Sequence, residues 1–375
     1  MKTFAVLALF LLASVSSAQA AQPDNVVSPE VLPDHRVTFR LRAPKATEVS
    51  FYGDWMPVGT STNMAKSEQG VWSVTLGPLP PSIYIYNFTL DGIAIADPVN
   101  PRMKLRARTS ASLLEVPGAT PEVWQPRDVP HGTIEIVNHK SPVIGGETRQ
   151  AWVYKPAGYD KQTSKHYPIL YLLHGSNDTP AGWSTVGGAN FILDNLIAEK
   201  KAEPMIVVMP FGHAVPFTAP REIQSRNTTV FEEYLLKDLM PEVEKRYRIT
   251  AGRQNRAIVG LSMGGGQALH VGLSHLDLFA SVGSFSGAVP GDFETRFKAL
   301  LDDPAGTNKK LKLFWIGCGK DDSLFGRSKN LDSVLESHKI AHTFRASEGA
   351  HTFTVWRQFL AEVVPQLFQK NVKGK

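Results

Sequence analysis

Continuous apolar runs alternate with helix-length segments from residue 133 onward, and this alternation constrains the fold more than any other feature of the sequence. The apolar runs are Ile169–Leu173, Met205–Met209, Ala257–Gly260, Phe279–Phe285 and Leu311–Ile316. The helix-length segments are Ala189–Lys200, Thr229–Tyr247, Gly264–Ser274, Arg327–His338 and Val355–Phe368. Strands buried on both faces read as unbroken apolar runs, so the pattern predicts a mostly parallel sheet covered by helices. We expect the earlier pair Thr133–His139 and Glu147–Lys155 to form an antiparallel edge.

Residues 37–116 show a different pattern, in which short alternating runs are broken by Gly and Pro. These runs are Val37–Leu41, Glu48–Tyr52, Val71–Leu76 and Tyr84–Leu90. Asp91 and Gly92 form a pair typical of a hairpin turn. Runs of this length and spacing predict a small β-sandwich.

Four aromatic residues of this segment, Trp55, Trp72, Tyr84 and Tyr86, have the chemistry of a sugar-stacking platform. In a small sandwich, however, such side chains usually fill the core. We therefore expect them to pack inside the module or dock against the larger domain rather than bind carbohydrate.

The first residues have the pattern of a secretory signal peptide. Lys2 precedes the apolar stretch Phe4–Ala13, and small residues ending in Ala18–Ala20 follow it. The stretch is too short to span a bilayer. The sequence thus divides into a signal peptide at 1–21, a β-sandwich module at 22–117, a Pro-rich linker at 118–132 and an α/β domain at 133–375, and we expect a secreted or periplasmic protein.

Charge and cysteine content exclude several classes of protein. The formal net charge is +5, and the positive residues are scattered rather than clustered on one stripe as in nucleic-acid-binding proteins. We therefore expect neither a nucleic acid nor a membrane as partner. Cys318 is the only cysteine, so no internal disulfide can form. Because it ends an apolar run, we expect a small buried residue and not a nucleophile.

The segment from Gly260 to Gly264 has the pattern G-x-S-x-G and lies between an apolar strand and a helix rich in Gly and Ala. A sharp turn from strand to helix projects the side chain at its apex, here Ser262, and flanking glycines allow the neighbouring backbone to pack closely. The helix N-terminus behind Ser262 favours negative charge beside it. The sequence therefore predicts that Ser262 is a nucleophile.

A serine nucleophile needs a base and a carboxylate to orient that base, and in such a sheet they follow in the order Ser, acid, His. Asp321 and Asp322 lie in the loop after the strand that ends near Ile316, and the sequence separates the two poorly. His351 precedes the last helix and is the expected base. We expect His270, His275, His338 and His342 to be packing or surface residues, whereas His35, His131, His139, His166 and His213 lie at strand ends or in loops with no partner that the sequence identifies. No His-Glu-x-x-His pattern or Cys pair predicts a metal.

Two backbone amides are expected to hold the oxyanion of the tetrahedral intermediate. One is the amide after the nucleophile, that of Met263. The other should lie in the loop after an earlier strand, and Ser176, which follows His174 and Gly175, is the candidate. Such a mechanism requires no cofactor and no metal.

Several segments together resemble a known family. They are Tyr171–Gly175, Val208–Pro210, Gly260–Gly266, Cys318–Leu324 and Gly349–Trp356. From about Thr133 to Phe368 the chain resembles the bacterial feruloyl esterase and esterase D group of α/β-hydrolases. The segment Val37–Pro98, including Phe51–Trp55, is similar to the immunoglobulin-like module, of the glycogen-branching-enzyme type, that precedes some of these esterases.

The resemblance implies an α/β-hydrolase catalytic domain in which Ser262 is the nucleophile, His351 the base and Asp322, directly before Ser-Leu, the acid. It implies a carboxylic ester hydrolase acting on a small-molecule or polysaccharide ester, foremost hydroxycinnamoyl (ferulic-type) esters of plant cell-wall polysaccharide. Acetylxylan and siderophore esters are the alternative substrates. An acyltransferase of the same fold and a noncatalytic carbohydrate-binding protein are the rival functions. The oligomeric state is left open.

Overall fold

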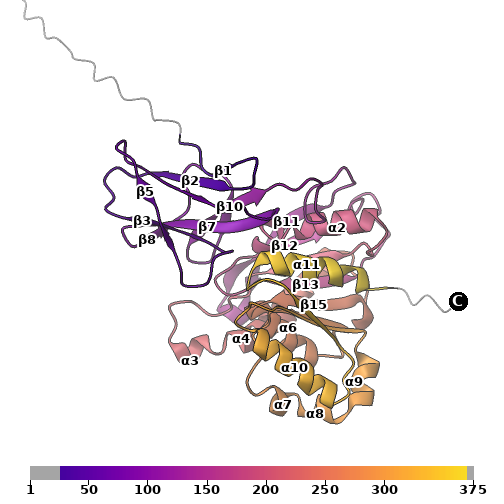
Figure 1. The fold of residues 1–375 in the computed structure, drawn as a ribbon. Coiled ribbons are helices and arrows are strands. Elements are labelled where there is room, and N and C mark those ends of the chain that lie inside the picture. Colours follow the sequence, from indigo (N-terminus) through magenta and orange to yellow (C-terminus); the bar gives the residue numbers. More distant parts are fainter. Residues whose placement is uncertain (1–25, 370–375) are drawn as a thin grey trace, which may run out of the picture.

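Strands β1 to β10 form two antiparallel sheets that face each other in a small β-module (Figure 1). The computed structural model describes residues 26–369, so the predicted signal peptide lies outside the described residues. One sheet has the order β1 (Glu30–Val31), β2 (Val37–Arg42), β6 (Val71–Leu76), β5 (Ala65–Lys66). The other has the order β4 (Thr62–Asn63), β3 (Val49–Gly53), β7 (Ser82–Leu90), β10 (Ser110–Val116), β9 (Met103–Leu105), with β8 (Ile93–Ile95) beside β7.

The space between these sheets is filled by aromatic and aliphatic side chains, among them Phe39 and Phe51. Trp72, Tyr84 and Tyr86 are buried in this core, which confirms the expectation that they pack inside the module. Trp55 is only partly buried and packs against the same core. The β-sandwich predicted from the short alternating runs is therefore present.

The larger domain is built on an eight-stranded sheet whose order differs from the order of the chain. The strands run β11 (Thr133–Ser141), β12 (Glu147–Lys155), β14 (Ile206–Pro210), β13 (Ile169–Leu173), β15 (Arg256–Leu261), β16 (Ser281–Phe285), β17 (Leu313–Gly319) and β18 (Thr343–Ser347). The pairs from β14 to β18 are parallel, and β11 and β12 form the antiparallel edge. The mostly parallel sheet with an antiparallel edge is thus confirmed.

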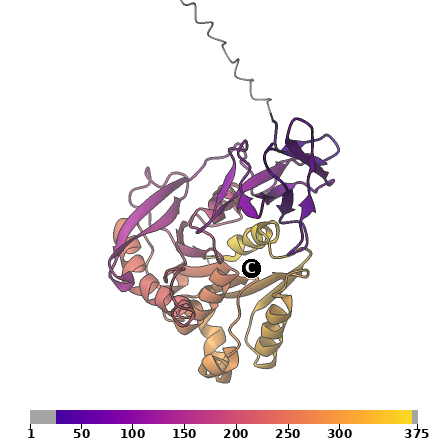
Figure 2. The same cartoon turned by 90° about the vertical axis from the view of Figure 1, so that its left-hand side faces the viewer.

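Helices bury both faces of this sheet, as its unbroken apolar strands require (Figure 2). In β13, Tyr171 packs with one hydrophobic cluster and Leu170 and Leu172 with the other. Helices α2 (Ala189–Ala198) and α11 (Phe353–Val363) cover one face. Helices α4 (Asn227–Tyr234), α5 (Met240–Arg246), α6 (Met263–Ser274) and α10 (Phe325–Ser337) cover the other. The short helices are α1 (Gly182–Thr185), α3 (Arg221–Gln224), α7 (Phe293–Arg296), α8 (Lys298–Asp302) and α9 (Pro304–Lys310).

The helix-length segment Thr229–Tyr247 contains a wider turn. Residues Leu235–Leu239 form a π-helical turn between α4 and α5. Pro241 in the first turn of α5 has no amide hydrogen and cannot donate the regular intrahelical bond, which accounts for the local widening.

The β-module packs on α11, so that this helix lies between the module and the sheet (Figure 1). Ile83 and Ile85 of β7 share a hydrophobic cluster with α2 and α11. Arg357 of α11 is fully buried and donates hydrogen bonds to Ser82 Oγ (3.0 Å), the Ile83 carbonyl (3.0 Å) and the Val186 carbonyl (3.2 Å). The two domains are therefore joined by apolar packing and by a buried arginine.

Candidate active site

Ser262 lies at the turn between β15 and α6 and has a left-handed φ of 53° with ψ of −117°. Non-glycine residues rarely adopt this conformation, and here neighbouring backbone holds it. The Ser262 amide donates to the Phe285 carbonyl (2.9 Å), and the Ser262 carbonyl accepts from the Ala288 amide (2.9 Å). A Cβ at Gly264 would lie 2.5 Å from the His174 carbonyl oxygen, so this position has no room for a side chain. The local sequence thus produces the predicted strained turn.

The structure brings the predicted nucleophile, base and acid together from three loops. His351 Nε2 lies 2.9 Å from Ser262 Oγ, and His351 Nδ1 lies 2.7 Å from Asp322 Oδ2. Asp322 follows β17, and His351 precedes α11. The His351 ring also packs in a T-shaped arrangement with the Trp356 ring, with centroids 4.8 Å apart. These distances suit proton transfer from the serine hydroxyl to an imidazole oriented by a carboxylate.

Asp322 is the acid that the structure places against His351. Its side chain is fully buried, whereas Asp321 is exposed. Burial opposes ionisation of Asp322, but hydrogen bonds from His351, the Leu324 amide and Ser286 outweigh it and hold the pKa of the carboxyl below its usual value. The carboxylate therefore stays charged in the buried site.

The two predicted oxyanion donors lie beside Ser262. A Cβ at Gly175 would lie 3.3 Å from Ser262 Cβ, which shows how closely the loop after β13 approaches the nucleophile. Among the described residues, neither the Ser176 amide nor the Met263 amide donates a hydrogen bond. Free amides next to a nucleophile are suited to binding an oxyanion.

Two histidines to which the sequence assigned no partner, His174 and His213, hold the oxyanion loop. The Gly212 amide donates to His174 Nε2 (2.9 Å), so Nδ1 of the neutral ring carries the proton and donates to the Gly175 carbonyl (2.8 Å). His213 Nε2 accepts from the Asn177 amide (3.0 Å). Burial lowers the pKa of both rings, that of His213 to about 4, which keeps them neutral as acceptors. No motif marks His213, because its partner is distant in the sequence.

Cys318 is fully buried in β17, as expected, and its sulfur lies 3.7 Å from Ser286 Oγ. Burial raises the pKa of the thiol to about 11. A buried neutral thiol is a poor nucleophile.

Two adjoining cavities meet at His351, and the β-module contributes to the walls of both. The smaller, about 230 Å³, contains Ser176, Ser262 and His351 in its lining. The module residues that line it are Tyr52, Asp54, Ile85, Lys104 and Arg106. The larger, about 720 Å³, shares Tyr52, Asp54, His351 and Thr352 with the first. Contact of the module with the site was not predicted from the sequence.

Asp54 is the most unusual of these residues. Its Oδ1 accepts from the Ile85 amide (3.1 Å), but its Oδ2 is buried without a hydrogen-bond partner. Burial raises the pKa of this carboxyl from 3.8 to about 6, although Arg357 and Lys104 oppose the shift. A buried carboxylate with an unused acceptor is costly to the fold.

The substitution Asp54→Asn is expected to stabilise the protein at pH 8 by about 1 to 3 kcal/mol and to have little effect near pH 4. Because the pKa of Asp54 is higher in the folded state, the folded chain keeps a proton between about pH 4 and 6 that the unfolded chain has lost. The carboxylate therefore destabilises the fold increasingly as pH rises through that window. Urea unfolding at both pH values measures the difference, and a less stable variant at pH 8 would contradict it. Glu68→Gln, at an exposed position of the same module, is the control.

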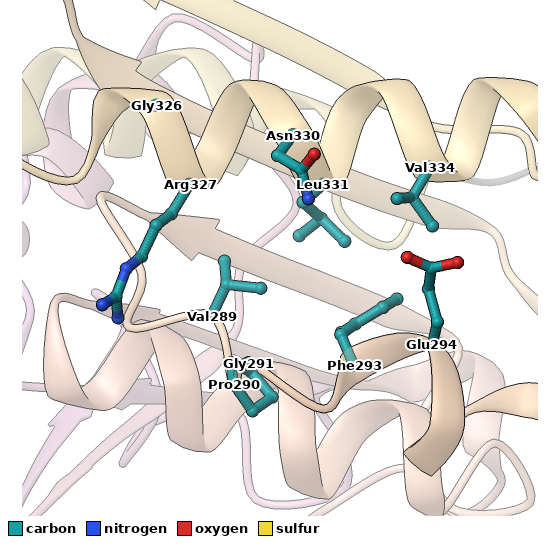
Figure 3. A pocket seen from close by; sticks show the side chains of 10 residues that line it. All are labelled: Val289, Pro290, Gly291, Phe293, Glu294, Gly326, Arg327, Asn330, Leu331 and Val334. Carbon is teal, nitrogen blue, oxygen red and sulfur yellow. The ribbon is translucent and has the colours of Figure 1, made fainter.

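A third cavity, of about 380 Å³, lies between the loop before α7 and helix α10 and contains none of these groups (Figure 3). Val289, Phe293, Leu331 and Val334 give it an apolar floor, and Glu294 and Arg327 lie at its edges. Its lining contains no serine, cysteine or histidine, so the serine chemistry belongs to the cavities at Ser262. Within residues 26–369, no three His, Cys, Asp or Glu side chains are grouped to hold a metal ion.

The fold and the site together define an α/β-hydrolase, in which serine, histidine and aspartate meet at the carboxyl ends of parallel strands. The family model described as "Putative esterase" matches residues 141–367, more than half of the chain. The chain therefore belongs to this family of esterases.

Individual relatives agree with this assignment. An endo-1,4-beta-xylanase/feruloyl esterase of Xylanibacter ruminicola is 31% identical over 336 residues, which cover 88% of this chain but only 44% of that protein. This chain thus spans less than half the length of that relative. The structure of a ferulic acid esterase from Anaeromyces mucronatus in complex with ferulic acid is 26% identical with a TM-score of 0.59, covering 68% of this chain and 98% of that one.

The enterobactin esterase of Shigella flexneri shares the fold over a longer stretch. Its TM-score is 0.66 at 20% identity, covering 89% of this chain and 93% of that one. Separately, none of the helices in the described part of the chain is both long and apolar enough to cross a membrane.

Proposed function

We propose that this chain is an exported serine esterase that releases hydroxycinnamic, ferulic-type acids from esters on plant cell-wall polysaccharide. The observation that carries the proposal is the contact of Ser262 with His351 and of His351 with Asp322, beside two free amides. The relative named as a xylanase/feruloyl esterase and the esterase structure with ferulic acid support the substrate class. The signal-peptide pattern of residues 1–21 supports export.

In the proposed mechanism, His351 takes the proton of Ser262 as Oγ attacks the ester carbonyl carbon. The amides of Ser176 and Met263 hold the resulting oxyanion. His351 then gives the proton to the oxygen of the leaving alcohol while its bond to the acyl carbon breaks, which leaves an acyl-enzyme. Water repeats both steps and frees the acid and Ser262. Because the side chains and amides supply every proton transfer and charge contact, the steps require no cofactor.

The two cavities that meet at His351 give room on both sides of the scissile bond. Ser176 and Ser262 line only the smaller one, whereas Asp321 and Trp55 line only the larger. An ester in which both the acid and the alcohol are bulky, such as a hydroxycinnamoyl sugar, fits this arrangement better than a small acetyl ester of a small alcohol.

Hydrolysis of methyl ferulate, p-nitrophenyl acetate and acetylated xylan by residues 22–375 tests the proposal. We expect free ferulate, with kcat/KM for methyl ferulate at least about tenfold above that for p-nitrophenyl acetate, because the cavity binds the larger acyl group. Activity on acetyl esters alone would indicate that the substrate is acetylxylan and not a hydroxycinnamoyl ester. Acyl transfer to an added sugar that exceeds hydrolysis would indicate an acyltransferase, and no acid release from any ester would contradict the proposal.

A further inference from the structure

The strand β9 and the residues that follow it contact the oxyanion loop directly. Lys104 Nζ lies 2.8 Å from Asp178 Oδ2, and the Ala107 amide donates to the Asn177 carbonyl (3.1 Å). Thr179 Oγ1 donates to the Leu105 carbonyl (3.4 Å). Residues 104–107 of the β-module therefore contact residues 177–179, which directly follow Ser176.

The Lys104–Asp178 ion pair is buried at the boundary of the two domains. The side chains are 8% and 5% exposed, and the ammonium group also lies over the Phe353 ring, 4.5 Å from its centroid. Burial lowers the pKa of Lys104, and the charge of Asp178 opposes this. Buried pairs add little net stability compared with apolar residues, but breaking one leaves an uncompensated charge. Such a pair is better suited to fixing a geometry than to stabilising the fold.

Asp178 is coupled to the turn that carries the Ser176 amide. Its Oδ1 accepts from the Thr179 amide (2.8 Å), and its own amide donates to the Gly175 carbonyl (3.3 Å). The turn Gly175–Asp178 therefore contains Ser176, and the Asp178 carboxylate at the last residue of this turn is held by Lys104 and the Thr179 amide. Asn177, which has a left-handed φ of 57°, is held within it by His213 on the other side.

We propose that Lys104 of the β-module is a positioning residue for the oxyanion hole, acting through Asp178 to aim the Ser176 amide at the reacting carbonyl. The inference rests on the proposed role of Ser176. The β-module is thereby part of the catalytic apparatus, because a group of this module fixes one of the two donors that stabilise the transition state. Misplacing such a donor lowers kcat more than it weakens substrate binding.

The substitution Lys104→Met in the full chain tests this with p-nitrophenyl acetate as substrate. We expect kcat to fall by about 10- to 100-fold while KM changes less than about threefold. The inhibition constant of phenylboronic acid, whose tetrahedral serine adduct places an oxygen in the oxyanion hole, should rise by a similar factor. Lys104→Arg, which keeps a cation, should restore part of kcat. Arg102→Met, which removes a surface cation just before β9, is the matched control and should leave both constants unchanged.

The double variant Lys104→Met/Asp178→Asn distinguishes a loss of kcat caused by a misplaced Ser176 amide from one caused by unfolding. It removes both charges of the pair, so no unpaired charge is left to destabilise the fold. If the pair positions Ser176, kcat stays at least about tenfold low and the boronic acid still binds weakly although the protein is folded. Recovery of wild-type kcat in the double variant, or unchanged kcat and boronic acid binding in Lys104→Met, would overturn the inference. A wild-type chain that hydrolyses no ester would instead overturn the proposed function, and this inference with it.

Discussion

Replacing Ser262 with alanine is expected to lower kcat for ester hydrolysis by about 10⁵- to 10⁶-fold, because no acyl-enzyme can form without the Oγ nucleophile. His351 and the two free amides remain in place, so substrate binding should change little. The fold should be retained, because the hydroxyl contacts His351 but the turn is held by backbone bonds to Phe285 and Ala288. Release of acid from a chromogenic ester under saturating conditions measures the effect.

Ser274→Ala is the matched control, since Ser274 is exposed at the opposite end of α6. It should leave kcat and KM unchanged. Mass spectrometry adds a second readout, because the wild-type chain mixed with a slowly deacylating ester should gain the mass of the acyl group and Ser262→Ala should not. If Ser262→Ala kept more than about 1% of the wild-type kcat, Ser262 would not be the nucleophile.

The strands, turns and helices that could be predicted from the sequence are those whose pattern lies within one short segment of the chain. The strand, turn and helix around Ser262 follow from an apolar run, a G-x-S-x-G pattern and a helix-length segment that are adjacent in the chain. The same holds for His351, which precedes the last helix. The parallel sheet could be predicted because its strands are buried on both faces. Such strands are unbroken apolar runs and do not alternate between apolar and polar residues.

Contacts between distant segments could not be predicted in this way. Asp54, Lys104 and Arg357 reach the boundary of the two domains, and their partners are tens to hundreds of residues away in the chain. A buried charge has no sequence signature until its partner is known, since lysine and arginine are usually exposed. The sequence thus indicated two domains but not that the smaller one lines the cavity at Ser262.

Asp322→Asn is expected to lower kcat by about 10³- to 10⁴-fold with little change in KM. An amide at this position donates as well as accepts, and it favours the wrong tautomer of His351, so that Nε2 no longer accepts the Ser262 proton. Because the side chain of Asp322 is fully buried, solvent cannot reach this position and take over the role of the carboxylate at His351 Nδ1. Hydrolysis of a chromogenic ester between pH 5 and 9 measures the loss, which should persist across the whole range because the charge itself is gone.

Asp321→Asn is the comparison that decides the acid, because the two residues are adjacent and the sequence alone separates them poorly. Asp321 is exposed and lines the larger cavity, whereas Asp322 Oδ2 lies 2.7 Å from His351 Nδ1. The variant should therefore keep kcat within about threefold of wild type for a small ester, as expected for a surface charge outside the hydrogen-bond chain. A severe loss in Asp321→Asn together with a mild one in Asp322→Asn would mean that the loop rearranges during the reaction and that Asp321 orients the base.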